Sequence, residues 1–203
     1  MVTCLCADYM QEAAFVTQRL SRLLAYVGAV VLVGIGVAFI LAGGLPERNE
    51  YMGVLNDPSM APQIGAFAPD FTRRRLDGVP LTLSQQHGKI VLLNFWGTWC
   101  APCEIEMPLL QTLHEDYPDL VLWAMNLGED PTQIVPWIEA RGLTFPILLD
   151  QTRALEYIYA LRGQPSTFII RGDGRIVTII DGPIREEALR PLLDELFAKE
   201  NES

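Results

Sequence analysis

Two cysteines three positions apart, Cys100 and Cys103, are the side chains of this sequence best suited to chemistry. They follow a run of residues, 90–96, that is apolar except for Asn94 and whose length and composition are typical of a strand buried on both faces of a sheet. After them, apolar residues recur at helical spacing from residue 107 to residue 117. The sequence therefore predicts that both thiols lie where a buried strand passes into a helix.

A thiol at the start of a helix is activated by the backbone. The first N–H groups of a helix have no partner inside it, and the helix dipole favours negative charge there, so we expect Cys100 to be the thiolate nucleophile. Cys103, one turn further on, is close enough to attack a mixed disulfide formed by Cys100 and release the product. Pro102 suits the first turn, where a missing N–H costs nothing. The pair predicts a two-electron redox couple that needs no further cofactor.

Composition limits the classes of protein to which the chain can belong. Its 203 residues predict one domain plus attachments, and with 50% hydrophobic residues this domain can bury a core without disulfide staples. The cysteines are therefore free for chemistry. A formal net charge of -10, with no basic stripe, argues against a nucleic-acid partner bound through its phosphates, because such binding needs Lys and Arg.

The uncharged residues 23–45 predict a transmembrane helix. As a helix they would rise about 35 Å, enough to cross a hydrocarbon core of about 30 Å. Arg19 and Arg22 precede this segment and an acidic flank follows it, so the positive-inside rule places residues 1–22 in the cytoplasm and the C-terminal domain outside. A cleaved signal peptide is the alternative, although its apolar part is usually shorter.

A C-x-x-C pair alone also fits half of a zinc site or a structural disulfide. Zinc needs two further ligands, but Cys4 and Cys6 lie across the predicted membrane span, and His87 and His114 form no paired-ligand motif. We expect Cys4 and Cys6 to be incidental, or to precede a true start at Met10. Placement between strand and helix favours the redox couple, and no metal site is expected.

The remaining sequence predicts a tether, residues 46–65, followed by a domain, residues 66–203. The tether contains three prolines and no hydrophobic periodicity. The domain alternates strand and helix signals, which favours an α/β fold with a mixed sheet. The expected strands are residues 71–75 and 79–83 in an opening hairpin, 90–96, 120–125, 147–149, and 166–171 and 175–180 in a second hairpin; the expected helices end near 117 and span 132–141, 153–161 and 186–199.

The segment NFWGTWCAPCEIEMP, residues 94–108, resembles the active-site segment of the thioredoxin superfamily, specifically its membrane-anchored TlpA/ResA-type thiol-disulfide oxidoreductases. The resemblance extends over about residues 65–198. It implies a thioredoxin-like mixed sheet flanked by helices, with the hairpin as an N-terminal extension and one N-terminal transmembrane helix. Further matching segments are FAPDF, NLGED, FPILLD and GQPSTFIIRGDGRI.

The resemblance also implies a substrate-binding surface. Pro165 falls at the family's cis-proline, which packs opposite the dithiol and presents backbone to a substrate peptide. Gln164, directly before it, is expected to bind substrate as well. Trp99 and Pro102 are expected at the rim that faces the substrate, because an aromatic side chain next to the nucleophile offers a large apolar contact.

The resemblance implies that two positions, 94 and 106, distinguish the chain from general thioredoxins. Those proteins carry a buried Asp six residues before the first cysteine, where this chain has Asn94. Glu106 matches the acid of the ResA-like C-x-P-C-x-x-E pattern and could accept the Cys103 proton; its charge would raise the thiol pKa and favour a reductant. The alternative is that Glu106 is a solvated acid at a helix start. Glu129 matches a second family acid near the site.

By resemblance, the protein is expected to reduce disulfides in exported proteins outside the cytoplasmic membrane. The implied client is an apocytochrome c during cytochrome c maturation, and the implied electron donor is a membrane thiol transporter of the CcdA/DsbD kind. A copper-binding metallochaperone-type module is an alternative, because two thiolates can bind Cu(I). A peroxiredoxin-like peroxidase is the least favoured, because its P-x-x-x-T-x-x-C motif is replaced at Leu93 and Gly97.

Overall fold

The computed structural model describes residues 26–32, 34 and 60–201. It divides into residues 1–50 and 51–203, which are described separately. In the first unit, residues 26–32 and 34 are helical. The predicted tail, residues 1–22, lies outside the described residues, as do most of the predicted span 23–45 and most of the tether. Among the described residues, no helix has the length and apolar character needed to span a bilayer.

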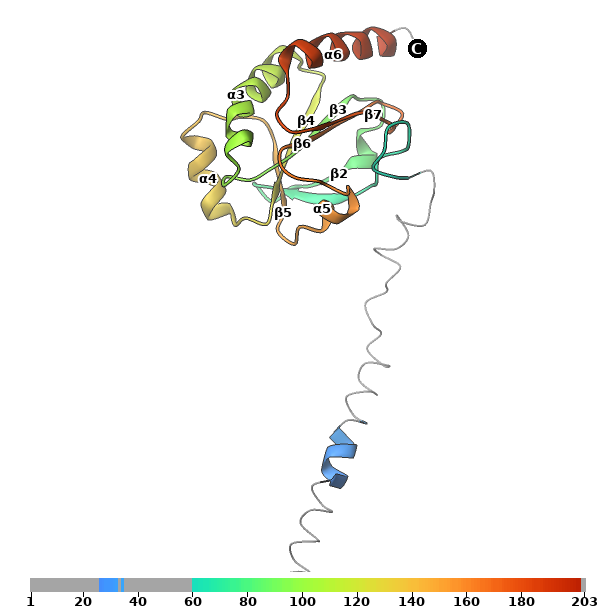
Figure 1. Cartoon of the computed structure of the whole chain (residues 1–203), viewed down its shortest axis with the longest axis vertical. Coiled ribbons are helices and arrows are strands. Elements are labelled where there is room, and N and C mark those ends of the chain that lie inside the picture. Colours follow the sequence, from blue (N-terminus) through green and yellow to red (C-terminus); the bar gives the residue numbers. More distant parts are fainter. Residues whose placement is uncertain (1–25, 33, 35–59, 202–203) are drawn as a thin grey trace, which may run out of the picture. The chain divides into compact units, whose positions relative to one another are not determined.

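In residues 60–201, seven strands form one mixed sheet in the order β2-β1-β5-β4-β3-β6-β7 (Figure 1). The central strand β3 pairs parallel with β4 and antiparallel with β6. This confirms the predicted mixed sheet. The strands are β1 (Thr72–Arg75), β2 (Pro80–Thr82), β3 (Val91–Trp96), β4 (Val121–Leu127), β5 (Ile147–Asp150), β6 (Ser166–Ile170) and β7 (Ile176–Asp181).

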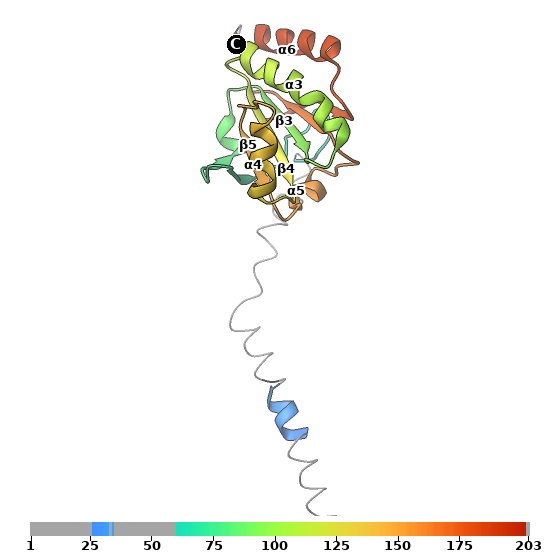
Figure 2. The same ribbon diagram turned by 90° about the vertical axis from the view of Figure 1, so that its left-hand side faces the viewer.

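Helices cover both faces of the sheet. The helices are α3 (Ala101–Asp116), α4 (Pro131–Glu139), α5 (Ala154–Ile158) and α6 (Glu186–Asn201), with the 3-10 helix η1 (Leu83–Gln86). Buried side chains of α3, α4 and α6 share one core, and those of α5 and η1 share the other. The two views show α3 and α6 side by side, with α5 on the opposite side of the sheet from α3 (Figures 1 and 2).

The alternation of side chains along β3 explains both cores. Leu92 and Trp96 face the core under α3, while Leu93 and Phe95 face the core under α5. All six residues of β3 are buried, as expected for a strand covered on both faces. Each large apolar side chain removed from water contributes about 1.5–3 kcal/mol, so this central strand is firmly held in place.

The predicted opening hairpin is confirmed, and it joins the main sheet. Strands β1 and β2 pair antiparallel across a turn in which Gly78 has φ +86°, a conformation that favours glycine. Strand β1 also pairs with β5, and Arg73 forms an ion pair of 3.2 Å with the buried Asp150 that ends β5. The hairpin therefore extends the sheet at the edge away from β6 and β7.

Helix α5 is shorter than the sequence predicts. The expected range was residues 153–161, but the helix spans only Ala154–Ile158. Arg153 and Ala160 both have positive φ, 57° and 48°, and neither conformation continues a right-handed helix. The chain therefore leaves α5 early and enters the segment that leads to Pro165.

Candidate active site

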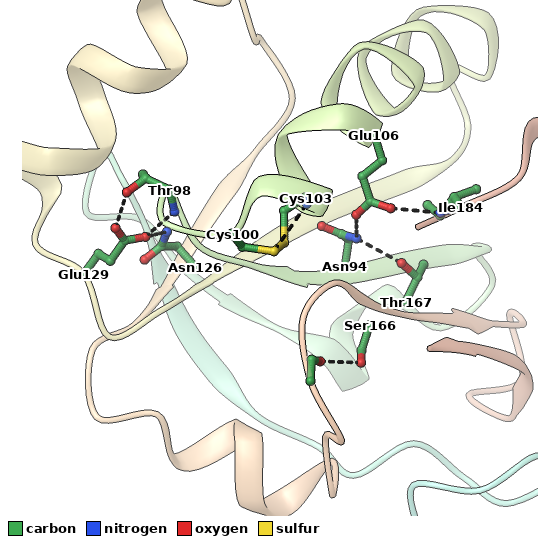
Figure 3. The surroundings of a disulfide bond; sticks show 11 residues. Asn94, Thr98, Cys100, Cys103, Glu106, Asn126, Glu129, Ser166, Thr167 and Ile184 are labelled. Atoms are coloured by element: carbon green, nitrogen blue, oxygen red, sulfur yellow. Dashed lines mark hydrogen bonds between the residues drawn. A yellow bond between two sulfur atoms is a disulfide. The ribbon is translucent and has the colours of Figure 1, made fainter. Parts of the chain in front are cut away.

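Cys100 and Cys103 form a disulfide at the N-terminus of α3, the position that the sequence predicts (Figure 3). Cys100 is the N-cap residue, with extended backbone, and its Sγ accepts a hydrogen bond of 3.3 Å from the backbone N–H of Cys103. Both sulfurs lie in the core shared with Trp96 of β3. The helix terminus thus provides an N–H donor to Cys100, which favours a thiolate there once the disulfide opens.

The turn between β3 and Cys100 is closely packed. The Trp99 indole lies against Gly97, where an added Cβ would be 2.7 Å from Trp99 Nε1. Only glycine therefore allows Trp99 to keep this position. Trp99 is 56% exposed and Pro102 is also exposed, so both lie on the surface next to the disulfide. Their contact with substrate stays a prediction.

Glu106 is buried, and the alternative of a solvated acid is therefore wrong. Its side chain is 3% exposed and lies on the core side of α3, one turn after Cys103. Oε1 accepts a hydrogen bond of 2.7 Å from Asn94 Nδ2, and Oε2 accepts one of 3.0 Å from the backbone N–H of Ile184 (Figure 3). Two fixed donors therefore hold the carboxylate beside the dithiol.

The environment of Glu106 suits proton transfer near neutral pH. Burial raises the pKa of this carboxyl from 4.5 to about 7, against the lowering effect of the hydrogen bonds from Ile184 and Asn94. A carboxyl with such a pKa is present in both protonation states at neutral pH. It can therefore accept a proton from a neighbouring thiol and return it.

Glu129 lies on the other side of the disulfide and binds the turn that carries it (Figure 3). Oε2 accepts hydrogen bonds of 2.7 Å from the backbone N–H of Thr98 and 2.6 Å from Asn126 Nδ2. The Thr98 hydroxyl also donates to Glu129. With its oxygens engaged in this way, Glu129 holds the backbone two residues before Cys100, and its role as a second acid stays a prediction.

The Gln164–Pro165 peptide is cis, as the resemblance implied. Ser166 opens β6 and pairs with Phe95 of β3, which brings the cis peptide to the end of β3 from which the chain continues to Cys100. The Ser166 hydroxyl donates a 2.8 Å hydrogen bond to the carbonyl of Gly163 and so fixes this loop. Substrate binding by Gln164 and Pro165 stays a prediction.

Sequence reasoning missed two features of the site. Ile105 is 75% exposed on α3, one turn from Ala101, and so presents an apolar side chain to solvent near the start of this helix. An apolar residue between two acids, off the helical spacing of the core positions, was the available signal. The second is the backbone N–H of Ile184, which donates to Glu106 from a residue far away in sequence.

Among the described residues, no group of three or more His, Cys, Asp or Glu side chains is placed to hold a metal.

Comparisons with known proteins agree with this geometry. Residues 64–179 match the AhpC/TSA family. The chain is 37% identical over 135 residues to "Thiol-disulfide oxidoreductase ResA" of Geobacillus thermodenitrificans. This alignment covers 66% of the chain and 78% of the relative. The chain is 33% identical over 162 residues to the Bacillus thuringiensis protein of the same name, covering 79% of this chain and 93% of the relative.

The fold is also similar to that of a solved structure. The crystal structure of StoA from Bacillus subtilis superposes with a TM-score of 0.54 at 30% identity, over 61% of this chain and 96% of that chain. The site itself contains the Cys100–Cys103 disulfide, the buried Glu106 and the cis-proline Pro165. The same chain is 33–37% identical to the two ResA proteins. The chain belongs to the ResA-type thiol-disulfide oxidoreductases of the thioredoxin superfamily.

Proposed function

We propose that this thiol-disulfide oxidoreductase works as a reductant of disulfides in exported proteins, with Cys100 as the attacking cysteine and Cys103 as the resolving one. The observation that carries the proposal is the Cys100–Cys103 disulfide at the N-terminus of α3. A bond between these sulfurs is the oxidised product that such a reaction leaves on the protein. The names of the relatives favour disulfide exchange over Cu(I) binding and over peroxidase activity.

The reaction begins from the reduced protein. The Cys100 thiolate attacks one sulfur of the substrate disulfide, forms a mixed disulfide and releases the first substrate thiolate. Cys103 then loses its proton to Glu106 and attacks Cys100 Sγ. The mixed disulfide breaks, the second substrate thiolate leaves, and the Cys100–Cys103 bond forms. Two electrons pass from the protein to the substrate, and Glu106 holds the Cys103 proton until solvent removes it.

The buried carboxyl also supports the reducing direction. When ionised, Glu106 places negative charge beside the dithiol, which disfavours a second negative charge on sulfur and raises the thiol pKa. A dithiol that is not stabilised as thiolate tends to give up its electrons to a substrate disulfide. This supports a reductase rather than a strong oxidant.

The proposal places the domain on the outer face of the cytoplasmic membrane. The uncharged residues 23–45, with Arg19 and Arg22 before them, support this orientation. An apocytochrome c, whose thiols must be reduced before haem attachment, is the client that the family resemblance favours. Electrons would return to Cys100 and Cys103 from a membrane thiol transporter of the CcdA/DsbD kind.

The order of attack can be tested by trapping. The Cys103→Ser variant cannot resolve a mixed disulfide, so we expect it to accumulate a covalent adduct with a disulfide-bearing protein such as insulin, visible on a non-reducing gel. The Cys100→Ser variant is the matched control and should form no adduct. An adduct on Cys103 in that control would reverse the assigned roles.

The apolar surface of Ile105 predicts a second result. Ile105→Glu places a charge on the exposed side of α3, the helix that begins directly after Cys100, and we expect kcat/KM for reduction of a protein disulfide to fall about tenfold, equivalent to about 1.4 kcal/mol of lost contact. Reduction of the Cys100–Cys103 bond by a small dithiol should not change. Tyr157→Glu is the control, because Tyr157 is 82% exposed on α5, across the sheet. Equal losses in both variants would argue against a docking role for Ile105.

A further inference from the structure

The side-chain amide oxygen of Asn94 is buried in the core of the site without a hydrogen-bond donor. Asn94 is fully buried in the middle of β3. Its Nδ2 donates hydrogen bonds of 2.7 Å to Glu106 Oε1 and 2.9 Å to Thr167 Oγ1. Its Oδ1 is buried and accepts no hydrogen bond. Because a buried acceptor without a donor is costly, it requires a physical explanation.

The direction of the Asn94 amide follows from its neighbours. In the structure, the nitrogen of Asn94 faces Glu106 and Thr167, to which it donates, and the oxygen therefore faces the other way. Figure 3 shows this oxygen on the side of Asn94 that faces Cys103. In the disulfide, neither sulfur carries a hydrogen that could be donated to Oδ1.

We propose that Asn94 is a positioning residue whose Oδ1 accepts a hydrogen bond from the Cys103 thiol in the reduced protein. The inference rests on the proposed function in one respect, since it requires the disulfide to open. The oxidised protein leaves Oδ1 without a donor, and reduction supplies the donor. The amide therefore favours the reduced form over the oxidised one, and it favours the protonated state of Cys103 over the thiolate.

The step balances as follows. An incoming thiolate attacks Cys100 Sγ, the Cys100–Cys103 bond breaks, and its electron pair stays on Cys103 Sγ. The protonated Glu106 carboxyl gives this sulfur its proton, so the carboxyl becomes ionised and the sulfur becomes a thiol. Asn94 then contacts both groups: Oδ1 accepts from the Cys103 thiol and Nδ2 donates to the carboxylate. In the resolving direction, the proton returns to Glu106 and the thiolate attacks Cys100.

The S–H stretching band in the infrared spectrum tests this contact directly, because a hydrogen-bonded thiol absorbs at lower frequency than a free one. The full chain would carry Cys100→Ser, so that Cys103 cannot be oxidised by its partner, and serine at Cys4 and Cys6, so that Cys103 is its one thiol. We expect its band below that of the same chain in denaturant. Asn94→Leu should return the band to the denatured position.

Asn126 provides a matched control. It too is buried, donates from Nδ2 to a glutamate and has an Oδ1 without a partner, but its oxygen points away from the disulfide in Figure 3. Asn126→Leu should therefore leave the Cys103 band in place. If both leucine variants shift the band equally, or if the Asn94 variant leaves it unmoved, the proposal is overturned.

An equilibrium measurement gives the second readout. In a Glu106→Leu background, where neither a carboxylate charge nor a side-chain donor contributes at residue 106, Asn94→Leu should shift the glutathione equilibrium about threefold towards the disulfide, the effect of one weak hydrogen bond. An unchanged equilibrium would contradict the proposal. If Asn94→Leu fails to fold, the S–H band of the single-thiol protein that retains Asn94 decides alone. A band at the same frequency as in denaturant would show that the thiol makes no such hydrogen bond. The S–H band and the glutathione equilibrium are measured without a protein client. They can therefore contradict the role of Asn94 without contradicting the proposed disulfide reductase activity.

Discussion

Replacing Cys100 by serine should lower the rate of disulfide reduction by about a thousandfold or more, because the nucleophile of the first step is lost. The reduction of insulin by a dithiol, followed by turbidity, measures this directly. Thermal unfolding of the variant should be compared with that of the reduced wild-type protein, since both lack the disulfide. Substantial activity left in Cys100→Ser would mean that another group attacks the substrate.

Replacing Glu106 by glutamine should remove a pH dependence of stability. The folded protein holds the pKa of Glu106 at about 7, above its ordinary value of 4.5. Below about pH 4.5 the carboxyl is protonated in both the folded and the unfolded chain, and its full contribution to the free energy of unfolding is present. As pH rises towards about 7, the unfolded chain loses this proton first, so stability falls by about 3 kcal/mol in total, and above that pH no further change follows from this group.

Chemical unfolding at about pH 5 and about pH 8 measures this difference. Glu106→Gln should show a smaller fall in the free energy of unfolding than the wild-type protein, and its apparent thiol pKa should be lower, because no carboxylate charge opposes the thiolate. Glu104→Gln is the matched control: Glu104 lies on the exposed side of the same helix, in an ion pair with Arg141. If Glu104→Gln and Glu106→Gln show the same pH profile, the buried carboxyl is not the titrating group.

Local sequence signals were sufficient for the elements that carry the cysteines. Strand β3 was predictable because residues 90–96 are apolar except for Asn94, and α3 because its core positions recur at helical spacing. Both signals depend on neighbours within one turn or one strand. The position of Cys100 at the helix start follows from them, and the structure confirms it.

The surroundings of the two acids could not be predicted in the same way. The burial of Glu106 depends on Ile184, which approaches from the segment before α6, 78 residues later in the chain. The role of Glu129 depends on Thr98, 31 residues earlier, on a different strand end. Such contacts are created by the sheet order and leave no periodic signal in the sequence.

The cis peptide before Pro165 was predictable from family resemblance alone. X-Pro bonds in folded proteins are cis in only about 5–6% of cases, so the residue itself favours trans. The early end of α5 also escaped prediction, because the backbone at Arg153 and Ala160 takes a conformation that these residue types seldom adopt. In both places the fold overrides local preference.

The account depends most on the ability of Cys100 and Cys103 to cycle between dithiol and disulfide as a reducing couple. The midpoint potential of the full chain, measured in thiol buffers with alkylation of free thiols, tests this directly. We predict one two-electron transition near the value of thioredoxin, about -270 mV. A value near about -120 mV would instead identify an oxidant, and a pair that shows no transition would contradict the account altogether.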